Sequence, residues 1–125
     1  AAADNANYTS FKGYRFPWES AFTGLEVTPV CCPHVVEYQH HIIADIAFAF
    51  RSHLAATHDL EWWKNYGCDI AYNTAKFWES RVEFHNATQF YNIKDVMGPD
   101  EVSIAIFIMC IIIIIKSIGS QCHRQ

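Results

Sequence analysis

The clearest hydrophobic pattern in the chain is a pair of apolar stripes with helical spacing. The first begins near Gln39 and recurs every four residues, which is the repeat of one helix face. The second predicts a helix from about Asp69 to Val82. The stripes consist of Ile42, Ile46, Phe50 and Leu54, and of Ala71, Ala75, Trp78 and Val82. Because the connections between the helical segments are short, we expect antiparallel helical hairpins.

Shorter elements are predicted around these two helices. Asp59 can cap a short helix between them, and Gly67 lies where a glycine often ends a helix. Residues 1–8 fit the last turns of another helix. Residues 90–96 alternate approximately between apolar and polar side chains, which predicts a short strand paired with residues 82–84.

A loop rich in aromatic residues precedes the first stripe, interrupted by Gly13 and Pro17. Within it, Trp18 and Glu19 place a flat apolar face beside a carboxylate. Sugar-binding sites use that combination to stack a ring and bond its hydroxyl groups. The alternative is that Trp18 is an aromatic anchor that pins the loop to the core.

His41 opens the first predicted helix, and Asp45 follows four residues later. Residues at this spacing share one helix face, so the two side chains can meet. A capping or packing role and a substrate-binding role are both open for this pair.

Two carboxylates, Asp100 and Glu101, follow Gly98 and Pro99. A Gly-Pro pair continues neither a helix nor a central strand, so the carboxylates are expected at a loop tip. One interpretation is a solvated acidic turn. The other is a catalytic acid, which would need burial or a neighbouring charge such as Asp100 to raise the pKa of Glu101 above its usual ~4.3.

Charge and hydropathy exclude some classes of partner. The net charge of the 125 residues is -4 and no basic patch occurs, which argues against nucleic-acid binding. The apolar run at residues 104–115 is shorter than the ~20 residues of a membrane-spanning helix. We therefore expect neither a nucleic-acid nor a membrane partner.

The five cysteines lack the spacing of a disulfide framework, which indicates reduced thiols and favours the cytoplasm. Two glycosylation sequons, at Asn7 and Asn86, weakly indicate the opposite. One group could be considered for a metal, but it lacks the spacing of zinc ligands: Cys31, Cys32, His34, His40 and His41. No metal and no other cofactor is predicted.

Six short motifs lie in a fixed order between residues 15 and 101. They are RFPWESA (15–21), TGLE (23–26), HIIADIA (41–47), THDL (57–60), FWESRV (77–82) and VMGPDE (96–101). Each motif alone is weak, but together they resemble glycoside hydrolase family 65. That family includes acid trehalases, maltose, trehalose and kojibiose phosphorylases, and the animal glucosidase that acts on glucosyl-galactosyl-hydroxylysine.

The resemblance implies an all-α fold, as a fragment of an (α/α)6 barrel, with a short β-hairpin near residues 82–97. It implies an inverting glycosidase that cleaves an α-glucosidic bond and binds a carbohydrate substrate, glucosyl-galactosyl-hydroxylysine or a trehalose-like disaccharide. Such an enzyme uses one protonated carboxylic acid and one carboxylate base. By resemblance the acid is Glu101, and the expected substrate-binding residues are Trp18, Glu19, His41, Asp45 and Asp100.

The sequence departs from the family pattern after Glu101, where Val102, Ser103 and Ile104 stand in place of the Tyr-His that normally follows. Residues 102–125 contain nine isoleucines and no acidic residue, so we interpret them as an unrelated Ile-rich tail. Residues 1–101 are expected to be part of the catalytic barrel. Twelve helices of about 12 residues with connections of about 5 need roughly 200 residues or more, so the remainder of the barrel is missing. We expect the chain alone to be inactive.

Two alternatives stay open. One is a fragment of a disaccharide phosphorylase, in which phosphate replaces the activated water. The other is a non-catalytic helical interaction module whose apolar faces bind a partner.

Overall fold

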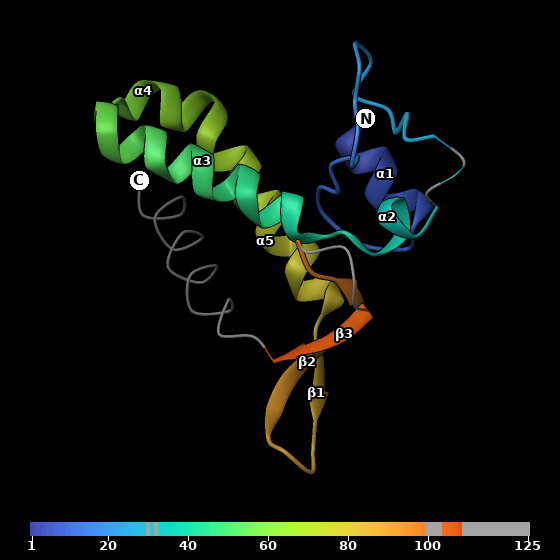
Figure 1. Ribbon diagram of the computed structural model, residues 1–125. Coiled ribbons are helices and arrows are strands. Elements are labelled where there is room, and N and C mark those ends of the chain that lie inside the picture. Colours follow the sequence, from blue (N-terminus) through green and yellow to red (C-terminus); the bar gives the residue numbers. More distant parts are fainter. Residues whose placement is uncertain (30, 32, 100–103, 109–125) are drawn as a thin grey trace.

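The structure, a computed structural model, describes residues 1–29, 31, 33–99 and 104–108. It is mostly helical, with a small antiparallel sheet at the end of the described chain (Figure 1). In chain order the elements are α1 (Ala2–Tyr8), α2 (Pro33–Tyr38), α3 (His41–Thr57), α4 (Leu60–Trp62), the π-helical turn η1 (Trp63–Gly67), α5 (Cys68–Arg81), β1 (Glu83–His85), β2 (Phe90–Met97) and β3 (Ile104–Ile108).

The predicted antiparallel hairpin is formed by α3 and the continuous segment α4–η1–α5, which runs back along it (Figure 1). Helix α3 ends at His58, whose left-handed backbone (φ 54°) turns the chain. The predicted cap at Asp59 is confirmed, because its Oδ1 accepts a hydrogen bond from the Trp62 backbone N–H at 2.8 Å. A cap of this kind satisfies a helix-end donor that would otherwise lack a partner.

The prediction that Gly67 ends the short helix is wrong. Its backbone is helical (φ -64°, ψ -43°), and the chain continues through η1 into α5. The glycine serves close packing instead, because a Cβ atom there would lie 2.2 Å from Cε3 of the Trp63 indole. Trp63 is only 6% exposed, so its ring occupies the space that a larger residue 67 would fill.

The buried face of each long helix lies close to its predicted stripe. On α5 the buried residues are Ala71, Thr74, Phe77 and Trp78. On α3 the buried residue is Ile43, whereas Ile42 and Ile46 are only half-buried. The helices were therefore predicted correctly, while the centre of the α3 core face is shifted by one residue.

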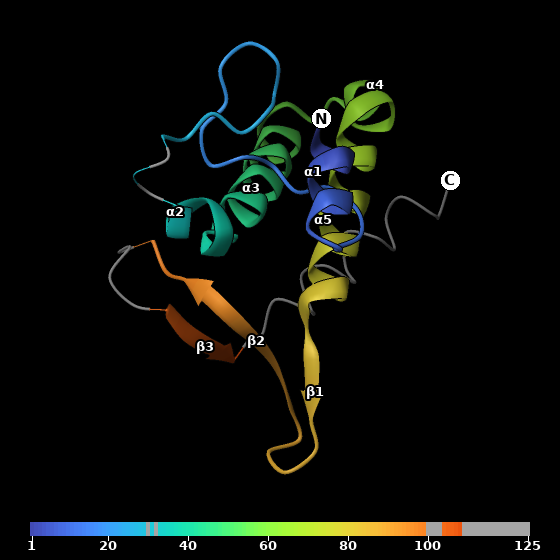
Figure 2. The ribbon, with the colours of Figure 1, turned by 90° about the vertical axis from the view of Figure 1, so that its right-hand side faces the viewer.

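The predicted hairpin is present as β1 and β2, with Phe84 paired to Tyr91. The sheet is nevertheless larger than predicted, because β3 pairs antiparallel with β2 on its other edge (Figure 2). The predicted all-α class with one short hairpin therefore lacks the third strand of this sheet. The register of β2 against β3 shifts between Ile93 and Val96. Asp95, inside that irregularity, has a positive φ of 52°, as bulged residues often do.

The core lies where the start of α3, the end of α5 and β2 meet. It consists of Ile43, Phe77, Trp78, Ile93 and Val96, with Phe11, Phe16, Ala44 and Val82 packed against it. Because Ile43 belongs to this core, the core fixes the first turn of α3, which begins with His41.

None of the helices in the described ranges combines the length and apolar character needed to cross a bilayer.

Substituting Gly67→Ala is expected to destabilise the protein, although Gly→Ala inside a helix normally stabilises by about 1 kcal/mol. The reason is the overlap with Trp63, since overpacking costs about 1–3 kcal/mol. The measurement is the urea midpoint of the helical circular dichroism signal. In a Trp63→Leu background the same substitution should become neutral or stabilising. A higher midpoint for Gly67→Ala in the wild-type background would contradict this account.

Candidate functional site

The loop that carries Trp18 and Glu19 is held by one carboxylate, that of Glu26. Its two oxygens accept hydrogen bonds from the backbone N–H of Trp18 at 2.6 Å, Glu19 at 3.3 Å and Thr28 at 3.0 Å. The Thr28 hydroxyl donates a further bond at 2.5 Å. The loop is closed again where the Val27 N–H donates to the Glu19 carbonyl. Glu26 therefore fixes the backbone that carries the Trp18 indole.

The same contacts keep Glu26 charged. Burial raises the pKa of its carboxyl group, but the hydrogen bonds from Thr28, Trp18 and Glu19 outweigh burial and leave the pKa below its usual value. Hydrogen bonds to a carboxylate stabilise its ionised form. The loop is thus held by a charged acceptor.

The indole of Trp18 meets the first residue of α3. The ring centroids of Trp18 and His41 lie 5.8 Å apart, and the rings are nearly perpendicular at 75°. This edge-to-face arrangement is a favourable one for aromatic rings. Two motifs that are more than twenty residues apart in the sequence therefore share one surface.

The His41 imidazole is fixed from both sides. Its Nδ1 lies 2.9 Å from Oδ2 of Asp45, so the predicted pairing on one helix face is confirmed. Its Nε2 lies 2.5 Å from Oε1 of Gln39. With an acceptor oxygen close to each ring nitrogen, the orientation of the ring is set by its neighbours.

Gln39 connects this group to the end of β2. The side chain is 5% exposed, and its Nε2 donates to the Met97 sulfur at 3.8 Å. Met97 directly precedes Gly98. The loop motif, the start of α3 and the approach to the Gly-Pro-Asp-Glu motif therefore converge at one place. Asp100 and Glu101 themselves lie outside the described residues.

The remaining predicted residues are accessible. Asp45 keeps 70% of its side chain exposed while it contacts His41. Glu19 is exposed, and its carboxylate bonds to no other residue in the described ranges. Trp18 is half-buried. Within the described part of the chain, no group of three or more His, Cys, Asp or Glu side chains could hold a metal ion.

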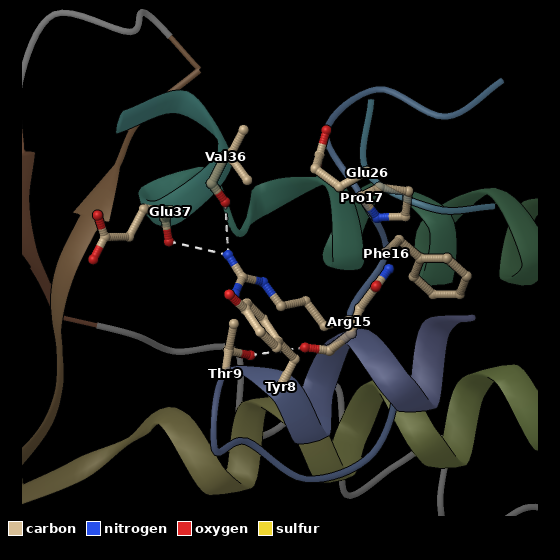
Figure 3. Close-up of a pocket in the computed structure, with 9 residues that line it drawn as sticks. Tyr8, Thr9, Arg15, Phe16, Pro17, Glu26, Val36 and Glu37 are labelled. Carbon is tan, nitrogen blue, oxygen red and sulfur yellow. Dashed lines mark hydrogen bonds between the residues drawn. The ribbon is translucent and has the colours of Figure 1, made fainter. Parts of the chain in front are cut away.

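Arg15 anchors the start of the loop to α2. Its Nη2 donates to the carbonyl oxygens of Val36 at 2.7 Å and Glu37 at 3.1 Å, which lie in the last turn of that helix (Figure 3). The side chain borders a cavity of about 320 Å³ beneath the loop, where Phe16 and Pro17 supply apolar walls. Capping carbonyl groups with a cation is favourable at a helix C-terminus.

His40 and Arg81 form a second anchor next to Arg15. Nε of Arg81 donates to Nδ1 of His40 at 3.1 Å, and Nη2 of Arg81 donates to the carbonyls of Lys94 and Asp95 in β2. Burial, followed by the charges of Arg15 and Arg81, lowers the pKa of His40 to about 3. His40 is therefore neutral at physiological pH and acts as a hydrogen-bond acceptor between two cations.

Comparison with known proteins decides the family. A sequence model of the glycosyl hydrolase family 65 central catalytic domain matches residues 1–108. The chain belongs to glycosyl hydrolase family 65. The resemblance inferred from the six motifs is thereby confirmed.

Several relatives in family 65 share 43% of the aligned residues with the chain. The kojibiose phosphorylase of Thermoanaerobacter brockii aligns over 110 residues, covering 81% of this chain and 14% of that protein. The protein-glucosylgalactosylhydroxylysine glucosidase of Dictyostelium discoideum aligns over 100 residues, covering 80% and 14%. The kojibiose hydrolase of Mucilaginibacter mallensis aligns over 101 residues, covering 81% and 15%. The chain thus spans a small part of the length of these relatives.

The sequence did not indicate which residues hold Trp18 and His41 in place. Glu26 was recognised only as part of a motif, although a carboxylate eight residues after Trp18 could have suggested a loop closure. Gln39 was named only as the start of the first apolar stripe, yet it bonds His41 directly. Arg15 and Arg81 were likewise recognised only as parts of motifs, because their partners, backbone carbonyls and the His40 ring, lie elsewhere in the sequence.

Acidification is expected to weaken the fold through His40. Its pKa is about 3 in the folded chain against an ordinary 6.5, so the unfolded chain binds more protons between these values. Stability should therefore fall as the pH drops through this window, by at most about 1.4 kcal/mol per pH unit. Urea midpoints between about pH 7 and pH 5 measure the slope.

The matched variants are His40→Gln, which retains an acceptor for Arg81 but does not titrate, and His58→Asn, which removes an exposed histidine. The slope should be shallower in His40→Gln and unchanged in His58→Asn. Equal slopes in the wild type and in His40→Gln would show that His40 does not control this pH dependence.

Proposed function

We propose that the chain forms part of an enzyme that cleaves an α-glucosidic bond with inversion of configuration, with Glu101 as the general acid. The observation that carries this proposal is the convergence of Trp18, His41 and Gln39 with Met97, four residues before Glu101. A catalytic acid must lie beside the sugar whose leaving oxygen it protonates. The convergence supports a sugar site and an acid at one place.

The proposed chemistry follows from the two carboxylates of the Gly-Pro-Asp-Glu motif, Asp100 and Glu101. Glu101 must hold a proton at neutral pH, and the adjacent Asp100 carboxylate would favour the protonated form by repulsion. In an inverting mechanism a second carboxylate activates water on the opposite face of the sugar. No residue of this chain is assigned to that role.

The proposed sugar site uses the accessible side chains of the surface. Trp18 offers an aromatic edge and face for ring stacking, while His41 fixes its position. The exposed carboxylates of Asp45 and Glu19 can accept hydrogen bonds from sugar hydroxyl groups. Because Gln39 and Asp45 already hold the His41 ring, the site would need little rearrangement to bind a sugar.

A disaccharide phosphorylase is the second candidate, favoured by the 43% identity to kojibiose phosphorylase. A phosphorylase and a hydrolase both align with this chain. The described residues therefore do not distinguish water from phosphate as the attacking group. An α-glucoside such as glucosyl-galactosyl-hydroxylysine or kojibiose is the proposed substrate class, following the names of the relatives.

The proposed domain organisation assigns residues 1–101 to part of the catalytic barrel and residues 102–125 to a tail, although strand β3 of that tail pairs with β2 and the family match extends to residue 108. Coverage of only 14–15% of the relatives supports the view that most of an (α/α)6 barrel lies outside these residues. We therefore propose that the chain is inactive by itself.

A chimaera tests the assignment of Glu101. Residues 1–101 replace the aligned segment of the Mucilaginibacter mallensis kojibiose hydrolase, and release of glucose from kojibiose without phosphate is measured. We expect activity in the chimaera and a loss in kcat of roughly 100- to 10,000-fold on Glu101→Gln, as for removal of a general acid. Glu79→Gln, on the exposed side of α5, is the control and should be neutral. An active Glu101→Gln chimaera would rule out the assignment.

The role of Trp18 is tested in the same chimaera. Replacing Trp18 by Ala should raise KM about tenfold, because losing an aromatic stacking contact costs on the order of 1.4 kcal/mol. Trp62→Ala, in α4, removes an indole of the same kind away from the proposed site and should leave KM unchanged. Circular dichroism verifies that both variants fold. An unchanged KM for Trp18→Ala would favour the anchor interpretation.

A further inference from the structure

A second cavity, of about 340 Å³, lies between α2, the start of α3 and β2. Its size falls within the ~300–1,000 Å³ range of small-molecule sites. Arg15, His40 and Arg81 line it, together with the carboxylates of Glu37 and Asp95. Arg15 is 8% exposed and His40 is 2% exposed, so two of the three nitrogen-bearing side chains are almost fully buried.

Several N–H donors of this group are unused. Because Nδ1 of His40 accepts a bond from Arg81, the proton of the neutral ring is on Nε2. That Nε2 atom is buried and has no partner with hydrogen-bond geometry in the described part of the protein, although the Glu37 backbone lies close enough to the ring to act on it. Arg15 and Arg81 each use one Nη atom for carbonyl groups, and within the described ranges no hydrogen bond involves their Nη1 atoms, which are not fully buried. A buried donor such as Nε2 of His40 normally has a partner.

The positive charge of the group is also not neutralised by direct contact. The ion pairs of the described residues join Ala1 to Asp4, His41 to Asp45 and Lys94 to Glu83, so neither Arg15 nor Arg81 takes part. Glu37 and Asp95 border the cavity but are themselves exposed to solvent. Glu26 and Glu37 act on Arg15, and Asp95 and Glu83 act on Arg81, all through space and without a direct ion pair. A buried charge such as that of Arg15 is usually paired by direct contact, so a counter-ion is expected here.

We propose that this cavity binds a small oxyanion, held by the Arg15 and Arg81 guanidinium groups and by the Nε2–H of His40. An oxyanion supplies both the missing charge and the missing acceptors, and guanidinium groups suit phosphate and carboxylate oxygens. The bound ion would connect the end of α2, the first turn of α3 and the bulge of β2. This site depends on no sugar chemistry and applies equally to a hydrolase and a phosphorylase.

The test is an NMR titration of the 125-residue chain, in which the arginine Nε–H and histidine Nε2–H signals are followed. Inorganic phosphate, sulfate and acetate are added separately, with chloride balancing the ionic strength. We expect saturable shifts of the Arg15, Arg81 and His40 signals. The exposed Arg51 is the internal control and should not shift. Assignment of the signals uses single Arg→Lys variants.

The three anions distinguish the sources of the oxygen atoms. Saturation by phosphate and sulfate alone would identify a tetrahedral oxyanion, and saturation by acetate alone would identify a carboxylate. Either outcome supports the site. A non-saturating response, or equal shifts at Arg51, would reduce the effect to general ionic screening and overturn the proposal.

An Arg81→Gln variant gives a second measurement. Phosphate should raise the urea midpoint of the wild-type chain and of Arg51→Gln, because a ligand that binds only the folded state stabilises it. The midpoint of Arg81→Gln should no longer respond. If Arg81→Gln does not fold, the wild-type titration alone decides. An undiminished response in a folded Arg81→Gln would contradict the proposed ligand set.

Discussion

The packing of one buried and one half-buried arginine around a neutral histidine is the constraint on which the rest of the structure depends. Arg15 holds the last turn of α2, Arg81 holds the bulged part of β2, and both surround His40 at the start of α3. Phe11 and Phe77 pack edge-on against the His40 ring, at 5.8 and 5.4 Å. Segments from both ends of the described chain are thereby joined through contacts that no local sequence pattern could specify.

The candidate sugar surface follows from this arrangement. His40 faces the buried group, while the next residue, His41, faces Trp18 and Asp45. The same turn of backbone therefore places the His40 side chain in the interior and the next side chain, His41, at the candidate sugar site. Gln39 extends the same turn toward Met97. The positions of the family 65 motifs relative to one another thus rest on the first turn of α3.

Elements with regular spacing could be predicted, and features that depend on distant contacts could not. The stripes of α3 and α5, the Asp59 cap and the β1–β2 hairpin all have local causes, and the structure contains each of them. Gly67 was misinterpreted because a glycine that ends a helix and a glycine that admits a neighbouring ring look alike in sequence. The pairing of His41 with Asp45 was predictable from helical spacing. Its contact with Trp18 required the fold, and the family motifs, not geometry, indicated Glu101.

The π-helical turn between α4 and α5 gives the helical hairpin room for one residue more than a regular helix would hold. Such a turn accommodates one residue more than an α-helix would over the same rise. Because η1 (Trp63–Gly67) takes up that residue, the buried face of α5 keeps its direction toward α3. Each residue of an α-helix advances the direction of the side chains by about 100°. Loss of one residue within η1 would therefore convert it to ordinary α-helix and leave that direction unchanged, whereas loss of a residue within α5 would turn the face that follows it by about 100°.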